Sequence, residues 1–287
     1  MKLIGLMLAR NEEWIVNASL DAALRWCDGV ALTLDRCVDP NAHALELRNS
    51  AKPCAVGYGP DSGVWDEMDL RQANLELGRK LGGTHFAIID ADEILTHNKL
   101  PVVRQEFEAL KPGEVLDVPM VATWDDLDHH RVDDPTWSTA WLSLGFADAP
   151  GLSWKPAEDG YHFHQRPPKG FTGRHRVWYH GVGGVMHLQF ANQRRLLAKH
   201  VLYRMVEHIR WPGRETVEQL NWKYSQALEP KGRLVDVPAE WWGSYRKTDI
   251  NLHDVPYQEQ EIQKMFNAHG MRAFAGLDLK GFVPNER

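Results

Sequence analysis

His85-Phe86-Ala87-Ile88-Ile89-Asp90-Ala91-Asp92-Glu93 sets two aspartates, at positions i and i+2, directly behind a short apolar run. A continuous apolar run of this length is typical of a parallel strand that is buried on both faces. In sheets of parallel strands, ligands bind at the carboxyl ends of the strands. The stretch therefore predicts a buried strand over 85–89 that presents paired carboxylates to a binding site.

Further apolar runs before this stretch alternate with segments of helical spacing. Strands are expected over 3–9, 30–34 and 54–58, and helices over 12–26, 41–50 and 68–81. Such alternation is typical of βαβ units. We therefore predict an α/β fold, in which a mixed and mainly parallel Rossmann-like sheet is flanked by helices. Arg10-Asn11-Glu12 and Asp35 also follow strands directly, so the pattern places them at the same edge as the aspartates.

The alternation weakens after residue 95. We expect a helix over 100–110 and a strand over 115–122, followed by a loop-rich stretch over 123–180 rich in Trp, Pro, Gly and His. Helical spacing returns over 193–211, 217–228 and 258–269. With no repeat and no clear linker, one domain with a helical C-terminal elaboration is the simplest organisation. Its parts are 1–125 for the donor, 126–215 as an acceptor or closing segment, and 216–287 as the elaboration.

Composition excludes a membrane-spanning or disordered chain. Hydrophobic residues make up 43% and charged residues 25% of the 287 positions, as in ordinary soluble proteins. No apolar run approaches the roughly 18–20 residues that cross a bilayer. Met1–Ala9 is expected to be a strand rather than a signal peptide, because charges interrupt it at Arg10–Glu13. Cys27, Cys37 and Cys54 lack metal spacing and are expected to be reduced thiols of a cytoplasmic protein.

Charge is distributed unevenly along the chain. Residues 1–150 hold 13 basic and 25 acidic residues, whereas residues 151–214 hold 11 basic and 3 acidic ones. The second segment also carries seven of the fourteen histidines. An acidic half beside a basic, His-rich segment is consistent with a place where a cation meets a polyanion, although solvated faces could give the same counts.

The paired aspartates suit a hard divalent cation. Mg²⁺ and Mn²⁺ prefer oxygen ligands and usually keep positions for water and substrate phosphates. A cation at Asp90 and Asp92 would neutralise a diphosphate leaving group. The alternative is a turn whose aspartates cap a following helix.

Four elements in this order resemble the family 2 glycosyltransferases, which have the GT-A fold. They are Ala9-Arg10-Asn11-Glu12-Glu13, Asp35 after the second strand, Arg71 with Asn74, and Asp90-Ala91-Asp92-Glu93. The resemblance covers roughly residues 1–125. The segment Asp35–Pro40 departs from the family, whose loop here is rich in Ser, Asp and Thr. The resemblance implies a transferase, here a hexosyltransferase, that uses an NDP-sugar such as a UDP-sugar with Mn²⁺ or Mg²⁺.

The resemblance also implies roles for individual residues. Asp92 would ligate the metal, with Asp90 near the donor ribose or a metal-bound water. His187, which ends the apolar run Val182–Met186, would join the metal or the diphosphate, or would otherwise be a core histidine. Arg194, Arg195 and Lys199 could meet phosphate oxygens. The donor pocket would be lined by Ala9, Arg10, Asn11, Glu12, Asp35, Arg71, Asp90, Arg195 and Lys199.

The acceptor side is less defined. Tyr161-His162-Phe163-His164-Gln165-Arg166 concentrates groups for acceptor or phosphate contact, at His162, His164 and Arg166, or is an aromatic surface loop. A general base for the acceptor hydroxyl is expected at Asp125, Asp126 or Asp159, although either acidic cluster could instead be a solvated turn. We expect residues 154–214 to fold over the open edge of the site, with His187 and Arg195 approaching the diphosphate.

Three classes of function remain open from the sequence. The first is the glycosyltransferase, whose hydroxyl acceptor would be a saccharide or a hydroxymethylated base in DNA. The second is a metal-dependent hydrolase or nucleotidyltransferase, although a nucleotidyltransferase should show a Gly-rich loop where Ala9–Glu12 stands. The third is a non-catalytic nucleic-acid-binding module, which the acidic total disfavours.

Overall fold

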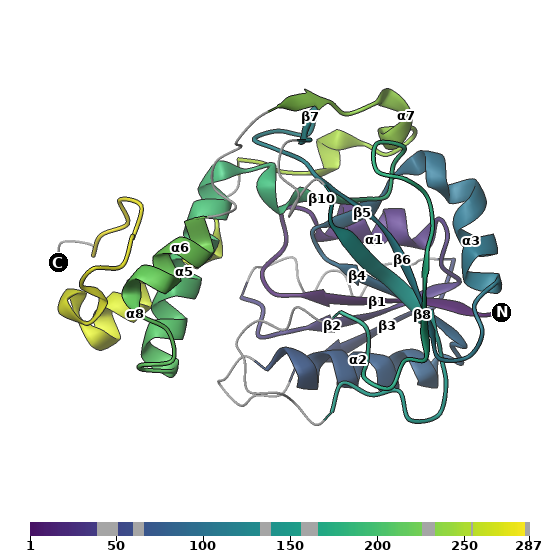
Figure 1. Cartoon of the computed structure of the whole chain (residues 1–287), viewed down its shortest axis with the longest axis horizontal. Helices are drawn as coiled ribbons and strands as arrows, with labels where there is room; N and C mark the ends of the chain where they lie inside the picture. The colour runs from purple at the N-terminus through teal and green to yellow at the C-terminus, as the bar shows by residue number, and fades with distance from the viewer. Residues whose placement is uncertain are drawn as a thin grey trace.

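The computed structural model describes residues 1–38, 51–59, 66–132, 139–155, 166–225, 233–253 and 255–284. The expected helix over 41–50 lies outside these ranges. Within them a nine-stranded sheet forms the centre of the molecule, in the order β3-β2-β1-β4-β8-β6-β10-β5, with β9 paired to β6 (Figure 1).

The first half of the sheet is parallel, as the apolar runs predict. It is built from β1 (Leu3–Ala9), β2 (Gly29–Leu34), β3 (Cys54–Tyr58) and β4 (His85–Asp90). The register pairs Ala9 with Leu34 and Leu8 with Asp90, so the carboxyl ends of β1, β2 and β4 lie side by side. The polar residues that follow these three strands therefore meet at one edge.

Helices cover both faces of this half (Figure 1). Along β1, Leu3 and Met7 pack into a cluster with α1 (Val16–Leu24) and α3 (Leu100–Glu108). Ile4 and Leu6 point the other way and pack with α2 (Glu67–Lys80). This alternation explains why the strand reads as continuously apolar.

The second half of the sheet departs from the sequence expectation. β8 (Trp141–Ala147) lies inside the stretch expected to be loop-rich, yet it pairs antiparallel with both β4 and β6 (Glu114–Ala122) in the core. Gly145 permits this close approach, because a Cβ there would lie 2.2 Å from the Phe86 carbonyl oxygen. The fold is therefore the mixed, GT-A-like α/β fold that the sequence predicts, with more antiparallel strands than expected.

Short strands complete the sheet near the paired aspartates. β5 (Glu93–Leu95) follows the turn after β4, and β10 (Val185–His187) pairs antiparallel with β5 and parallel with β6. β9 (Gly173–Arg176) extends the edge beyond β6, while β7 (His129–Arg131) and β11 (Leu234–Asp236) form a separate ribbon. These short strands have three or four residues each, too few to show an apolar run or an alternation in the sequence.

The first helix begins later than its spacing predicts. Asn11 adopts a positive φ of 54°, and the amides of Ile15 and Val16 donate to the Glu12 carbonyl oxygen. The regular helix α1 therefore starts at Val16 rather than Glu12. The backbone turn leaves residues 10–14 as a loop beside the carboxyl ends of the strands.

The C-terminal helices form an apolar cluster of their own beside the sheet (Figure 1). They are α5 (Gln193–Arg210), α6 (Val217–Ser225) and α8 (Tyr257–His269), while the short α7 (Ala239–Trp242) packs near α1. Val201 and Met205 of α5 meet Leu220 of α6 and Ile262 of α8 in this cluster. Among the described residues, no helix is long and apolar enough to span a membrane.

A buried histidine in this cluster predicts a pH-dependent stability. Burial lowers the pKa of His200 to about 3, and Lys199 and Arg204 also lower the pKa, although the Tyr224 carbonyl oxygen bonded to Nδ1 opposes the shift. Below pH 6.5 the unfolded chain binds this proton and the folded chain does not, so stability falls as pH drops. Each pH unit corresponds to about 1.4 kcal/mol. Between pH 6.5 and 4.5, the free energy of unfolding of H200Q should therefore fall by about 2 kcal/mol less than that of the wild type.

Urea unfolding at a series of pH values measures this effect. H269Q, at an exposed histidine of α8, should leave the pH slope of the wild type unchanged. Parallel slopes for H200Q and the wild type would show that His200 is not the group responsible.

Candidate active site

The turn between β4 and β5 brings the acidic motif to the edge of the sheet. Asp90 ends β4 and Glu93 begins β5. The amide of Leu188 donates to the Asp92 carbonyl oxygen at 2.8 Å, and His187 stands opposite Glu93 in the β10–β5 register. These backbone contacts join Asp92 to His187, although 94 residues separate them in the chain.

Asp92 faces two basic groups without closing a hydrogen bond to either. Its Oδ1 lies 3.6 Å from His187 Nε2, and its Oδ2 lies 3.8 Å from Lys199 Nζ. Burial alone would raise the pKa of Asp92, but His187 and Lys199 hold it well below the ordinary value. Burial would likewise lower the pKa of Lys199, but Asp92 and Glu12 raise it. Asp92 is therefore ionised, with His187 and Lys199 beside it at longer than hydrogen-bond distance.

Asp90 is bonded more tightly. Its Oδ2 accepts from Arg166 at 2.9 Å, and its Oδ1 accepts from Arg71 at 3.3 Å. Although burial opposes ionisation, the two guanidinium groups lower the pKa of Asp90. Arg71 also bonds Glu67 at 2.8 Å, and Asn74 of the same helix donates to the Met7 carbonyl oxygen. Arg71 and Asn74 thus connect α2 to the ends of β1 and β4.

Glu93 takes part in this cluster in a way that the motif alone does not reveal. Its carboxylate accepts two bonds from Arg166, at 2.6 and 2.7 Å, and one from the Asp90 amide at 3.0 Å. Glu93 is 1% exposed. Arg166, expected to contact the acceptor, is instead bonded to these carboxylates. The sequence offered one indication that Glu93 has a buried partner: it is an acid at the first position of a strand, where apolar residues are usual.

Glu12 lies on the other side of Asp92. Burial and the charge of Asp92 raise the pKa of Glu12 to about 7, although Arg195 and Lys199 oppose the shift. Glu12 accepts from the indole Nε1 of Trp14 and lies 3.9 Å from Arg195 NH1. The Arg195 guanidinium stacks on the Trp14 ring at 4.7 Å. The loop at 10–14 and the start of α5 therefore meet beside the acidic motif.

The donor residues expected at the ends of β1 and β2 also lie together. Asp35 is 4% exposed and accepts two bonds from Arg36, at 3.0 and 2.9 Å, while Arg10 NH1 lies 3.8 Å away. Asn11 Oδ1 accepts from the Val38 amide at 2.6 Å. Arg10 also reaches α8, where its NH2 lies 3.9 Å from Glu261. Ala9, Arg10, Asn11 and Asp35 thus lie close together at the ends of β1 and β2.

Of the residues expected on the acceptor side, fewer can be placed. Asp159, His162 and His164 lie outside the described residues. Asp126 accepts from the amides of Asp128 and His129 at 2.8 Å and from His129 Nδ1 at 2.7 Å, so both of its oxygens serve its own turn. Asp125 has a φ of 64°, and its amide donates to Phe190. Arg194 pairs with Glu259 on the exposed side of α5.

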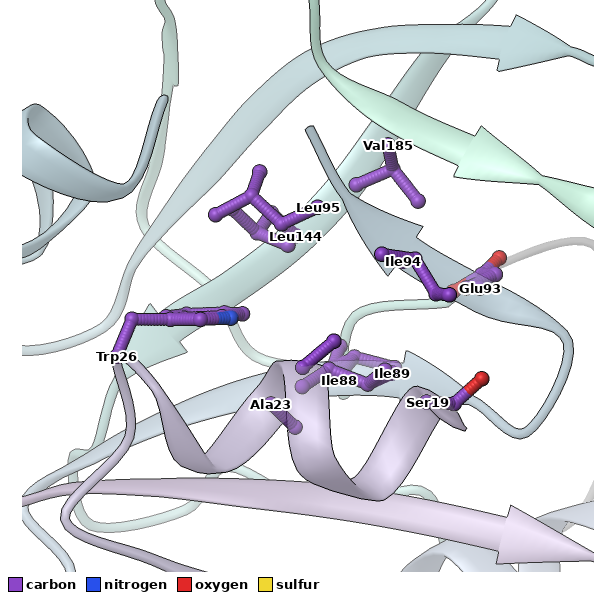
Figure 2. Close-up of a pocket in the computed structure, with 11 residues that line it drawn as sticks. Ser19, Ala23, Trp26, Ile88, Ile89, Glu93, Ile94, Leu95, Leu144 and Val185 are labelled. Carbon is purple, nitrogen blue, oxygen red and sulfur yellow. The ribbon is translucent and has the colours of Figure 1, made fainter. Parts of the chain in front are cut away.

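Two cavities lie near α1, and neither is lined by Asp90 or Asp92. The smaller, about 10 Å³, lies between α1 and the sheet and has room for about one water molecule (Figure 2). Ile88, Leu144 and Val185 surround it with the buried Ser19. The larger, about 310 Å³, lies between α1 and residues 242–250. Asp90 and Asp92 are thus separate from both cavities, whereas Glu93 lines the smaller one (Figure 2).

The donor atoms around Asp92 fit a divalent cation in part. Asp92 Oδ1 and His187 Nε2 lie 3.6 Å apart, and a carboxylate oxygen and an imidazole nitrogen are donors that a divalent cation such as Mn²⁺ would accept. Asp90, expected as a ligand, already accepts from two arginines. No group of three His, Cys, Asp or Glu residues that could hold a metal occurs in the described ranges. The chain would therefore supply two ligands, leaving the others to water and a diphosphate.

No family model matches the sequence, and no curated protein sequence matches it significantly. Among solved structures, TarS 1–349 of S. aureus is similar at 11% identity and a TM-score of 0.44, over 96% of this chain and 83% of that one. TarS 1–349 in complex with UDP gives 16%, a TM-score of 0.36, and 43% of this chain against 36% of that one. A 4-diphosphocytidyl-2C-methyl-D-erythritol synthase gives 15%, a TM-score of 0.33, and 51% against 72%. At these values the likeness assigns neither a family nor an activity.

Proposed function

We propose that the chain transfers a sugar from a nucleoside-diphosphate sugar to a hydroxyl acceptor. The observation that carries the proposal is Asp92, an ionised carboxylate at the carboxyl end of β4 with His187 and Lys199 at 3.6 and 3.8 Å. A carboxylate beside Lys199 and His187, at the carboxyl ends of parallel strands, suits a diphosphate with its counter-ion.

Lys199 and Arg195 are the side chains we assign to the leaving diphosphate. Both lie at the first turns of α5, beside Asp92 and Glu12 respectively. In the transfer, the bond between the anomeric carbon and the diphosphate oxygen breaks, and a bond to the acceptor oxygen forms. The acceptor hydroxyl loses its proton to a base, and negative charge develops on the diphosphate, where these cations would stabilise it.

A divalent metal, Mn²⁺ or Mg²⁺, is part of the proposal, with Asp92 and His187 as its protein ligands. When bound, it would supply charge neutralisation at the diphosphate. Arg10, Asn11 and Asp35 are the residues we assign to the nucleotide, because they follow β1 and β2 at the same edge. UDP is the nucleotide to test first, since the sequence resembles family 2 glycosyltransferases.

The placement of the basic residues favours a saccharide or small hydroxyl acceptor over DNA. Several cations of the segment 151–214 are paired with carboxylates of the chain itself. Arg166 binds Asp90 and Glu93, and Arg174 binds Asp117 at 2.9 Å. Arg204 is fully buried. These groups are not displayed for a phosphate backbone, whose recognition depends on accessible cations.

Ligand-dependent stability tests the proposal. UDP at about 100 times its Kd should stabilise the folded chain by about 2.7 kcal/mol, and the melting temperature should rise by about 5 °C. The rise should require Mn²⁺ and disappear with EDTA, because Asp92 and His187 hold the nucleotide through the metal. CTP with a sugar phosphate serves as the comparison for a nucleotidyltransferase. A shift with CTP but none with UDP or a UDP-sugar would contradict glycosyl transfer.

A further inference from the structure

A buried ion network stands behind the acidic motif. The Arg166 guanidinium makes four bonds to one short segment of chain: to the Ile88 carbonyl oxygen at 3.0 Å, to Asp90, and twice to Glu93. The Glu93 carboxylate closes the same turn by accepting from the Asp90 amide. The two side chains therefore fix the end of β4, the turn and the start of β5 together.

The free-energy cost of burying charged groups makes this network a poor means of stabilising a core. Arg166 Nε is buried without a hydrogen-bond partner, and burial opposes the charge of the Arg166 guanidinium. Buried ion pairs of this kind are often no more stable than apolar residues of the same size. Glu93 is followed by the buried Ile94 and Leu95, so apolar packing was available to this strand. A geometric role explains the charges better than a gain in stability does.

The two aspartates of the motif have different surroundings as a result. Asp90 is held by hydrogen bonds to Arg166 and Arg71, whereas the ion pairs of Asp92 within the described ranges are the longer contacts to His187 and Lys199. Ile88, Asp90 and Glu93 are all bonded to the Arg166 guanidinium. The turn that carries Asp92 therefore has little freedom to rotate. The Asp92 carboxylate is left on the side where α5 and β10 contribute their basic groups.

We propose that Glu93 and Arg166 are positioning residues, a clamp that orients the turn so that Asp92 alone faces the cation and diphosphate. The inference rests on the function proposed above. It assigns Arg166 to the donor side through Asp90 and Glu93, rather than to the acceptor.

The test compares the Mn²⁺ affinities of R166K and R79K. Electron paramagnetic resonance measures Mn²⁺ binding to each variant in the presence of UDP. Arg79 makes a similar bidentate pair with Asp148, at 2.9 and 2.8 Å, and also donates to a backbone carbonyl oxygen, but it joins α2 to the end of β8. Lysine keeps the charge and loses the fork in both variants. R166K should weaken Mn²⁺ binding about tenfold or more, as loss of an orienting partner does. R79K should bind Mn²⁺ within about twofold of the wild type, because a bond lost far from the motif acts on stability alone.

E93Q provides a second test if R166K does not fold, because glutamine keeps an acceptor for the Asp90 amide. It should weaken Mn²⁺ binding similarly, and the double variant should lose little more than either single variant. Wild-type affinity in R166K and E93Q would overturn the clamp and leave the proposed function standing. Failure of the wild type itself to bind Mn²⁺ and UDP would overturn both, so the two failures are distinct.

Discussion

Replacing Asp92 by asparagine should lower sugar transfer by about a thousandfold. The amide cannot supply the negative charge that holds a cation between Asp92 and His187, and cation stabilisation of a leaving diphosphate is worth several kcal/mol. A loss of about 4 kcal/mol corresponds to a thousandfold change in rate. Turnover of a UDP-sugar by D92N, measured over a range of Mn²⁺ concentrations, gives the size of the effect.

The matched control for D92N is D21N, which removes an exposed carboxylate from α1. D21N should retain wild-type turnover and wild-type inhibition by EDTA. The stability of D92N should be measured as well, because His187 and Lys199 lose their acidic partner in it. A folded D92N that transfers sugar at the wild-type rate would rule out Asp92 as the centre of the site.

Replacing Lys199 by methionine should lower turnover by about a hundredfold. Its side chain is half-buried, and its ammonium group lies 3.8 Å from Asp92 and donates to Gln189 at 2.9 Å. We expect it to stabilise charge that develops on the diphosphate, and loss of one such donor costs about a hundredfold or more. Because the interaction strengthens as charge develops, kcat should fall more than KM rises.

K223M is the appropriate control for K199M. Lys223 also joins two carboxylates, Glu207 and Glu215, but on the side where α5 meets α6. Its replacement should change stability slightly and leave kcat unaltered. Equal kcat values for K199M and the wild type would mean that the diphosphate lies elsewhere.

The sequence predicts the parallel half of the sheet well, because β1, β2 and β4 are buried on both faces and read as apolar runs. The same logic predicts the edge at which Arg10, Asp35, Asp90 and Asp92 meet. β8 was missed because its burial depends on partners on both sides, Phe86 and Leu116, that pair with it only in the folded sheet. β10 is three residues long and has no period to detect.

Only part of the site could be predicted, because some of its contacts, like those of β8, form only in the folded sheet. The contacts of His187 and Lys199 with Asp92 agree with their expected neighbourhood, while their roles toward metal and phosphate stay predictions. The bond from Arg166 to Glu93 joins residues 73 positions apart, and no local pattern encodes such a pair. Asp126 was a candidate general base or part of a turn in the sequence, and its oxygens are bonded within its own turn.

The order of the pairing partners along the chain has a consequence during synthesis on the ribosome. Glu12, Asp90, Asp92 and Glu93 are translated early, with only Arg71 among their basic partners, whereas Arg166, His187, Arg195 and Lys199 follow much later. At about 5–20 residues per second, the roughly 100 residues between Asp92 and Lys199 take about 5–20 s to emerge. Throughout that interval the nascent chain holds like charges that repel one another. The parallel half of the sheet can begin to form, but its acidic edge can settle only after α5 has left the exit tunnel.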